Sequence, residues 1–168
     1  MAQEKVSVLN AEQINRKIER IGHQIIELYY EESIVVLVGI AEQGYLLSER
    51  IRKIVESNSA IKVELIKLKL NKKDPINGTY DYSESDDILN DSSVVLVDDV
   101  LNSGRTLIYA AREILRHPIK KLTTVVLVDR RHRKFPIKAD FAGLTLSTTI
   151  QEHITVELNP GEEIAYLE

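Results

Sequence analysis

The sequence contains no cysteine and no tryptophan, and only 5% of its residues are aromatic. Without cysteine, disulfides, thiolate metal sites and a cysteine nucleophile are excluded, and a reducing compartment is favoured. So few aromatic side chains argue against a base-stacking platform for single-stranded nucleic acid. No apolar run is long enough to span a membrane, and no signal-peptide core follows the first residues. The net charge of −4 argues against nucleic-acid binding over the whole surface, but it is compatible with a local basic patch.

The length and composition predict one domain over residues 1–168. With 43% apolar and 29% charged residues, a chain of 168 residues can bury one core but not comfortably two. The apolar fraction also excludes a disordered or low-complexity chain. We therefore expect a cytoplasmic protein with a single domain and no membrane association.

The first regular element is an amphipathic helix that begins after Asn10. Gln13 stands three residues further on, which is the spacing of a capping box with Asn in place of the usual Ser or Thr. Apolar residues then recur at spacings of three and four and form one stripe: Ile14, Ile18, Ile21, Ile25 and Leu28. A second stripe of the helix is polar and carries Arg16, Arg20 and His23. Because a stripe of cations has no packing purpose, we interpret it as a binding surface.

Three continuous apolar runs predict strands in the middle of a sheet that is covered on both faces. They span residues 33–38, 94–97 and 122–128, and helical patterns lie between them. This alternation predicts an α/β fold with a parallel sheet, right-handed crossovers and helices on both faces.

The remaining segments predict an edge strand, a long loop and a small cap. Residues 63–70 alternate in their second half, as an edge or half-exposed strand does. Residues 71–92 are polar, acidic and without a clear period, which is typical of a functional or disordered loop, although Tyr80 and Tyr82 alternate around Asp81 as in a short hairpin. Short strands at 139–146, 153–158 and 164–167 predict a small cap rather than a second domain.

Residues 94–107 carry the chemistry. Asp98 and Asp99 directly follow a buried strand, and a turn of small residues then leads into a helix. Ligands of open α/β sheets bind at the carboxyl ends of the strands, and a helix N-terminus favours an anion. An acid pair beside a phosphate cradle indicates a ligand with vicinal hydroxyls next to a phosphate, such as a ribose 5-phosphate. The segment matches neither a Walker loop nor a dinucleotide-binding fingerprint.

In isolation, two aspartates would more simply end a strand, with Ser103 capping the helix. The whole segment, however, resembles the 5-phosphoribosyl 1-pyrophosphate (PRPP) signature of type I phosphoribosyltransferases, in which four apolar residues and two acids precede a Thr/Ser-Gly-x-Thr turn. The resemblance implies the fold of that family, a central mostly parallel sheet with helices on both faces and a small cap. It also implies a PRPP site made of Asp98, Asp99, Val100, Leu101, Asn102, Ser103, Gly104, Arg105 and Thr106.

Residues 10–26, 128–143 and 155–158 are similar to a narrower group, the pyrimidine operon attenuator family. Its members are bifunctional proteins with uracil phosphoribosyltransferase activity that also bind RNA. The resemblance implies transfer of the phosphoribosyl group from PRPP to a nucleobase, with uracil as the first candidate, and release of pyrophosphate. A nucleoside 5-monophosphate is then the second ligand of the same site.

The resemblance also assigns roles to individual residues. Asp98 and Asp99 would act in catalysis by holding the ribose hydroxyls, and residues 102–106 would hold the 5-phosphate. Mg²⁺ would bridge the substrate's oxygens and contact Asp98 and Asp99 only through ligand or water. Contacts to the base are implied at Asp129, Arg130 and Val156.

The pyrophosphate loop departs from the family pattern. In position it corresponds to Ala41, Glu42, Gln43 and Gly44, but relatives carry Lys-Thr-Arg where this chain has Ala-Glu-Gln. A direct contact between Glu42 and pyrophosphate would be repulsive unless the side chain points away or binds magnesium. The family's Arg-Asp-Asp is replaced at or near residues 71–73 by Asn-Lys-Lys, and the candidates to restore positive charge are Lys69, Lys72 and Lys73.

RNA binding and self-association are the remaining implications of the resemblance. A basic run such as residues 130–134 is most often a solvated face, but across a homodimer or larger assembly it joins the helix cations in one patch. Leu144 stands where relatives place a lysine, which weakens the case. The candidate RNA contacts are Arg16, Arg20, His23, Arg131, His132, Arg133 and Lys138.

Three functional hypotheses follow. In the first, the chain is a phosphoribosyltransferase with activity reduced by its altered pyrophosphate loop. In the second, it is a catalytically weak sensor of PRPP or nucleotide that binds RNA of pyrimidine genes. The third, a purely structural role in an assembly, is disfavoured because the acid pair and the phosphate cradle are both present.

Overall fold

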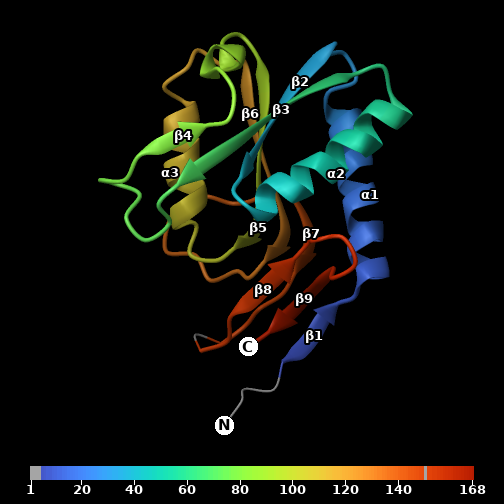
Figure 1. Ribbon diagram of the computed structural model, residues 1–168, viewed down its shortest axis with the longest axis vertical. Coiled ribbons are helices and arrows are strands. Elements are labelled where there is room, and N and C mark those ends of the chain that lie inside the picture. The colour runs from blue at the N-terminus through green and yellow to red at the C-terminus, as the bar shows by residue number, and fades with distance from the viewer. Residues whose placement is uncertain (1–4, 150) are drawn as a thin grey trace.

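The computed structural model describes residues 5–149 and 151–168 (Figure 1). Its centre is a six-stranded sheet with the strand order β4-β3-β2-β5-β6-β7, in which only β3 and β4 pair antiparallel. The strands are β2 (Ile34–Ile40), β3 (Lys62–Leu70), β4 (Tyr80–Tyr82), β5 (Ser93–Leu101), β6 (Lys121–Asp129) and β7 (Phe141–Thr145).

Helices cover both faces of this sheet. Figure 1 shows α1 (Ala11–Leu28) and α2 (Gln43–Asn58) on one side and α3 (Arg105–Ile114) on the other. Successive side chains of a strand point to opposite faces, so Val35 and Leu37 pack in the core with α1 and α2, whereas Val36 and Val38 pack in the core with α3. The predicted mostly parallel sheet with helices on both faces is confirmed.

Helix α1 begins with the predicted capping box. The Asn10 Oδ1 accepts the Gln13 N–H at 2.9 Å, and the Gln13 Oε1 accepts the Asn10 N–H at 2.9 Å. The four isoleucines of the apolar stripe are fully buried, but Leu28 is 38% exposed. Its assignment to the core was wrong because the helix ends there, and Tyr29, only 3% exposed, fills the core instead.

The expectations for residues 63–92 are met in part. Strand β4 pairs with only the last three residues of β3, so β3 is not an edge strand along its whole length, and its mixed burial agrees with a half-exposed strand. The segment after β3 is not one irregular loop: it contains the antiparallel β4, at the residues where a short hairpin is expected, and the short 3₁₀ helix η1 (Asp86–Leu89). Leu89, the last residue of η1, is fully buried and anchors the segment on the α3 side of the sheet.

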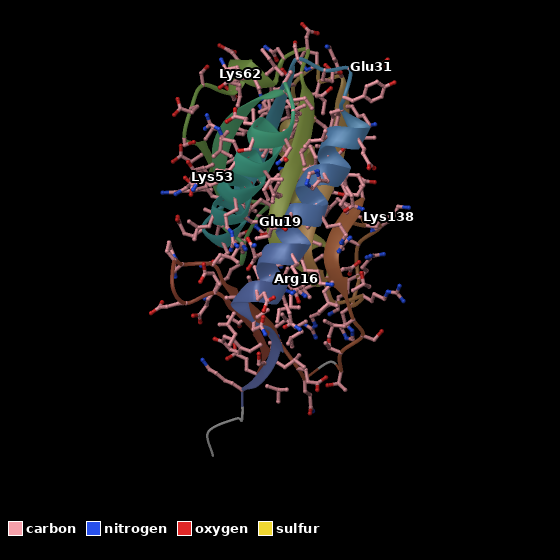
Figure 2. The ribbon with its side chains drawn as sticks, turned by 90° about the vertical axis from the view of Figure 1, so that its right-hand side faces the viewer. Arg16, Glu19, Glu31, Lys53, Lys62 and Lys138 are labelled. Carbon is pink, nitrogen blue, oxygen red and sulfur yellow. The ribbon has the colours of Figure 1, made fainter. Side chains whose placement is uncertain are left out.

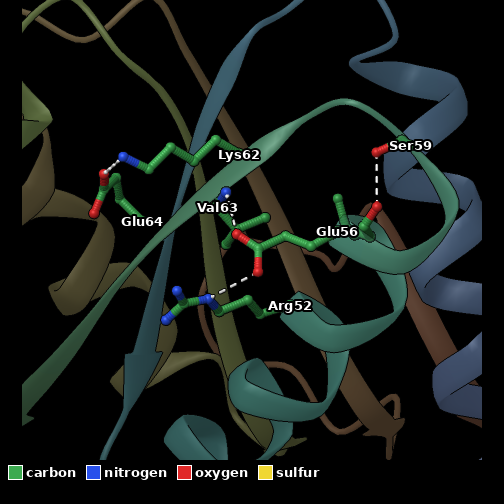
Figure 3. Close-up of polar contacts among 7 residues, drawn as sticks. Arg52, Glu56, Ser59, Lys62, Val63 and Glu64 are labelled. Atoms are coloured by element: carbon green, nitrogen blue, oxygen red, sulfur yellow. Dashed lines mark hydrogen bonds and ion pairs between the residues drawn. The ribbon is translucent and has the colours of Figure 1, made fainter.

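Polar contacts fix the connection from α2 to β3 (Figure 3). The Glu56 Oε1 accepts the Val63 N–H at 3.0 Å, and the Glu56 Oε2 lies 3.3 Å from the Arg52 Nε. The Ser59 hydroxyl donates to the Val55 carbonyl at 2.7 Å at the end of the helix. These contacts fix the end of α2 relative to the start of β3.

A second, antiparallel sheet has the order β1-β9-β8 and consists of β1 (Val6–Leu9), β8 (Ile154–Glu157) and β9 (Ile164–Leu167). It is the predicted small cap, completed by β1, which was not predicted. The segment 139–146 was wrongly assigned to the cap, because β7 continues the central sheet beside β6. In the part of the chain that the structure describes, no helix is long and apolar enough to cross a membrane.

Candidate functional site

A cavity of about 150 Å³ lies where β5 ends and α3 begins. Every residue from Asp98 to Leu107 lines it, so the acid pair and the following turn form one wall. The other lining residues come from the segment after β3, from β6 and from β8: Lys72, Val126 and Ile154. The sequence placed the cavity at this end of β5 but did not identify Leu107, Val126 or Ile154 as lining residues.

Asp98 and Asp99 differ in their surroundings. The Asp98 side chain is only 4% exposed, whereas Asp99 is half-buried. The Asp98 Oδ1 accepts the Asp99 N–H at 2.9 Å and lies 3.7 Å from the Lys72 Nζ. Burial and then the neighbouring Asp99 carboxylate raise the pKa of Asp98 well above its usual range, against an opposing effect of Lys72. The site therefore holds one costly buried carboxylate and one that is open to a ligand.

The turn between β5 and α3 is held in place from its outer side. The Ser103 carbonyl accepts the N–H groups of Lys134 and Phe135 at 2.8 and 3.1 Å, and the Ser103 hydroxyl accepts the Arg105 N–H at 3.3 Å. Gly104 has φ +85°, and a Cβ there would lie 2.8 Å from the Ile137 Cγ2, so both conformation and space require glycine. The N-cap residue Gly104 makes no side-chain cap, so apart from the Arg105 N–H that Ser103 accepts, the first turn of α3 is able to bind an anion.

The segment 41–44, which leads from β2 into the first turn of α2, packs against the end of β5 through the backbone of Gly44. A Cβ on Gly44 would lie 2.7 Å from the Val97 carbonyl oxygen and 3.1 Å from the Asp98 Cα. The side chains of the loop make contacts elsewhere. Glu42 forms a 3.2 Å ion pair with Lys67, and the Gln43 Oε1 accepts the N–H of Leu158 at 2.8 Å.

The three predicted base contacts, Asp129, Arg130 and Val156, do not line the cavity. Arg130 is 4% exposed and joins two loops: its Nη1 donates to the Asn102 Oδ1 at 3.1 Å, and its other nitrogens donate to the Thr148 hydroxyl at 2.6 Å and the Thr149 carbonyl at 3.0 Å. No pattern in the sequence indicates the distant hydrogen-bond partners of this arginine.

Asp129 is likewise occupied within the protein. Its carboxylate accepts the Arg131 N–H at 2.9 Å and lies 2.5 Å from the Arg133 Nη2. Val156 is buried in β8, where it is 3% exposed. The residue of β8 that does reach the cavity wall is Ile154.

The cations of α1 have individual roles. Arg16 pairs with Glu12, whereas the Arg20 guanidinium donates to the carbonyls of Gly143 and Ala142 at 2.7 and 3.1 Å. The view that this stripe has no packing purpose was wrong, because Arg20 connects α1 to β7. Figure 2 shows Arg16 on the face that α1 presents, with Lys138 at the side of the same view.

A second cavity, of about 490 Å³, lies at this face. It is lined by Val8 and Leu9 of β1, by the α1 residues Gln13, Arg16, Lys17 and Arg20, and by Leu144 of β7. Of the seven predicted RNA contacts, only Arg16 and Arg20 line it.

No group of three or more metal-ligating side chains occurs among residues 5–149 and 151–168. The donor set at the cavity is the carboxylate pair Asp98 and Asp99, which suits a hard cation that takes most of its ligands from substrate and water. The residues present therefore fit Mg²⁺ carried by a phosphate ligand, and they form no protein cage for it.

Comparisons with known proteins agree on one family. A model of the phosphoribosyl transferase domain matches residues 6–160. The chain is 34% identical over 159 residues to the bifunctional protein PyrR of Haemophilus ducreyi, covering 89% of this chain and 87% of that protein. It is 36% identical over 168 residues to the bifunctional protein PyrR of Clostridioides difficile, covering 92% of each.

Solved structures with low sequence identity share the fold. The hypoxanthine phosphoribosyltransferase of Trypanosoma cruzi superposes with a TM-score of 0.79 at 16% identity, covering 96% of this chain and 95% of that one. A hypoxanthine-guanine phosphoribosyltransferase of Bacillus anthracis gives 0.78 at 17% identity, covering 98% of each chain.

Proposed function

The chain belongs to the phosphoribosyl transferase domain family and, within it, to the bifunctional PyrR proteins, and from this membership we propose that it transfers the phosphoribosyl group of PRPP to a nucleobase, with uracil as the expected acceptor. The resemblance and fold class expected from the sequence are thereby confirmed. The observation that carries the proposal is the single cavity wall from Asp98 to Leu107, which combines carboxylates with an uncapped helix N-terminus.

Each part of this wall has a task in the proposed reaction. The first turn of α3, with the half-buried Thr106, binds the 5-phosphate through N–H and hydroxyl donors. Asp98 and Asp99 accept hydrogen bonds from the 2- and 3-hydroxyls of the ribose. Hydrogen bonds donated by the N–H groups of Lys134 and Phe135 to the Ser103 carbonyl hold the turn in place, so that the substrate meets a preorganised site.

The chemical step replaces the bond from ribose C1 to pyrophosphate with a bond from C1 to a nitrogen of the base, which gives up its proton. A displacement at C1 passes through a transition state with oxocarbenium character, as in glycoside chemistry. Two carboxylates at the ribose are placed to stabilise this positive charge. Mg²⁺, when bound with PRPP, would be held near Asp98 and Asp99 and would neutralise charge on the departing pyrophosphate.

Labelled PRPP with a panel of bases tests the proposal. We expect magnesium-dependent formation of a nucleoside 5-monophosphate from uracil, and we expect Thr106→Val to raise the KM for PRPP roughly tenfold because one charge-assisted hydrogen bond is lost. Ser92→Ala, which alters a hydroxyl in the turn before β5, is the matched control. Absence of turnover with every base, or an unchanged KM in Thr106→Val, would contradict this assignment.

RNA binding is a second candidate function, favoured by the cavity of about 490 Å³ with Arg16, Lys17 and Arg20 on its wall. The sequence also predicts that the protein is cytoplasmic and forms a homodimer, and both statements stay predictions. The structure changes the choice of test residue: replacing Arg20 would also loosen the contact of α1 with β7. Arg16 is the cleaner site, because it is exposed and its one ion pair within the described residues is with Glu12 on its own helix.

We expect Arg16→Ala to weaken binding of a pyrimidine-gene leader RNA and to lower the slope of log affinity against log salt by roughly 0.7 to 0.9, the value for one phosphate contact. Lys53→Ala on α2, away from α1 in Figure 2, is the control and leaves the slope unchanged. Filter binding across a salt series measures both. An equal slope in wild type and Arg16→Ala would remove Arg16 from the RNA surface.

A further inference from the structure

The pyrophosphate half of the proposed substrate lacks an evident partner in this chain. PRPP carries most of its charge on the 1-pyrophosphate, yet the loop at residues 41–44 contains no cation. The carboxylate of Glu42 is neutralised by Lys67 outside the cavity, and Gln43 is engaged by the backbone of Leu158. The loop therefore offers pyrophosphate its backbone but no positively charged side chain.

Two cationic side chains line the cavity, Arg105 and Lys72. Arg105 begins α3 and so belongs to the end of the cavity that binds the 5-phosphate. Lys72 comes from the opposite side, from the turn that follows β3, and its Nζ lies 3.7 Å from the Asp98 Oδ1. Its side chain is 47% exposed, so it is free to turn toward a ligand.

The turn that carries Lys72 has a defined shape. The Asn71 Oδ1 accepts the N–H groups of Lys73 and Asp74 at 3.0 and 3.2 Å, and the Gly78 N–H donates to the Asp74 carbonyl at 3.0 Å. This arrangement places Lys72 over the end of β5, while Lys73 makes no ion pair among the described residues and does not line the cavity.

We propose that Lys72 binds the pyrophosphate group of PRPP and supplies the positive charge that the loop at residues 41–44 does not. The inference rests on the proposed function, because it takes Asp98 and Asp99 as the ribose hydroxyl site. Pyrophosphate is attached at C1, beside the hydroxyl-bearing C2, so a cation within 3.7 Å of Asp98 lies next to the departing group. In the free protein Lys72 pairs with Asp98, and on binding it exchanges that carboxylate for phosphate oxygens.

This exchange explains how a buried carboxylate is tolerated before the substrate arrives. Asp98 has Lys72 as its only ion-pair partner in the described chain. Once ribose hydroxyls donate to Asp98, the lysine is released to a group of higher charge, and the buried carboxylate has a hydrogen-bond donor at both stages. Lys72 thereby selects ligands that carry a 1-pyrophosphate over those with ribose 5-phosphate alone.

Separate probes for the two halves of PRPP test the proposal by calorimetry. We expect Lys72→Met to weaken the binding of magnesium pyrophosphate roughly 10- to 100-fold, the loss for one charge-assisted contact. Binding of ribose 5-phosphate stays within about twofold, because its proposed contacts are Asp98, Asp99 and the first turn of α3 and do not include Lys72. Lys73→Met, which removes the same charge one residue away, leaves both affinities unchanged, and Lys72→Arg retains most of the pyrophosphate affinity.

The outcomes separate this inference from the proposed function. Unchanged pyrophosphate binding in Lys72→Met, or an equal loss for both probes, would overturn the role of Lys72, since an equal loss means that the whole site has been disturbed. A wild-type protein that binds both probes but turns over no base would contradict the transferase activity, while the selective loss in Lys72→Met would still support this inference.

Discussion

Replacement of Asp98 by asparagine is expected to make the protein more stable and almost inactive. Asn keeps the Oδ1 that accepts the Asp99 N–H, and it keeps the volume of the side chain. It removes the negative charge that the ribose hydroxyls and the developing positive charge at C1 require. We expect kcat/KM for PRPP to fall by about 100-fold or more, the order seen when one electrostatic contact to a transition state is removed.

The gain in stability follows from the buried charge. Burial and the nearby Asp99 carboxylate raise the pKa of Asp98, which means that ionising this side chain at neutral pH costs folding free energy. Removing the charge should raise the free energy of unfolding at pH 7 by roughly 1 to 3 kcal/mol. The lost ion pair with Lys72 subtracts little, because that lysine is 47% exposed.

The pH dependence has a definite sign. An acid whose pKa is higher in the folded state binds its proton more tightly there, so wild-type stability declines as pH rises above the usual Asp pKa of about 4. The decline continues up to the raised pKa of Asp98 and then levels off. The Asp98→Asn variant lacks this decline, so its advantage is absent near pH 3 and grows with pH.

Urea unfolding at a series of pH values measures the stability, and PRPP turnover measures the activity. Asp99→Asn is the matched control: its half-buried side chain contributes to the same ribose site, so activity falls, but the gain in stability is smaller because only the repulsion between the two carboxylates is removed and Asp98 stays buried. An Asp98→Asn variant that is less stable than wild type at pH 7 would show that the carboxylate contributes a structural contact which outweighs its burial cost.

The cavity wall could be predicted from the sequence because its parts are adjacent in the chain. Asp98 and Asp99 follow an apolar run, and Gly104 precedes a helical pattern, so local rules place an acid pair and a helix N-terminus at one edge of the sheet. The same reasoning gave the capping box of α1 and the buried strands. Each of these features depends on residues that lie close together in the sequence.

The features that were missed depend on partners far apart in the sequence. The Arg20 side chain meets carbonyls more than 120 positions away, and Gln43 meets Leu158 at a separation of 115. Local patterning gives neither the partners nor their positions, so the sequence alone predicts a free surface for the cations of α1 and a ligand loop at Gln43. Lys72 was one of three candidates, and only its position over β5 distinguishes it.

Arg130 is the most consequential of these long-range contacts, and Arg130→Met is expected to lower the free energy of unfolding by about 2 to 4 kcal/mol. Methionine preserves much of the buried volume but removes all three hydrogen bonds. The Asn102 amide, the Thr148 hydroxyl and the Thr149 carbonyl then lose a charged donor at a position that is 4% exposed. Lys134→Met, which removes a charge from the exposed part of the same basic run, is expected to change stability by less than about 0.5 kcal/mol.

The same variant decides between two roles for this arginine. If Arg130 contacted the base, its loss would raise the KM for uracil and leave PRPP binding intact. As a connection between the turn at Asn102 and the loop at residues 148–149, it instead maintains the shape of the phosphate site. We therefore expect Arg130→Met to weaken ribose 5-phosphate binding roughly tenfold at a temperature where the variant is still folded. Calorimetry with ribose 5-phosphate in the absence of any base isolates this effect, because a positioning residue acts on the turn whether or not a base is present. Unchanged binding of ribose 5-phosphate would contradict the positioning role and favour a contact between Arg130 and the base.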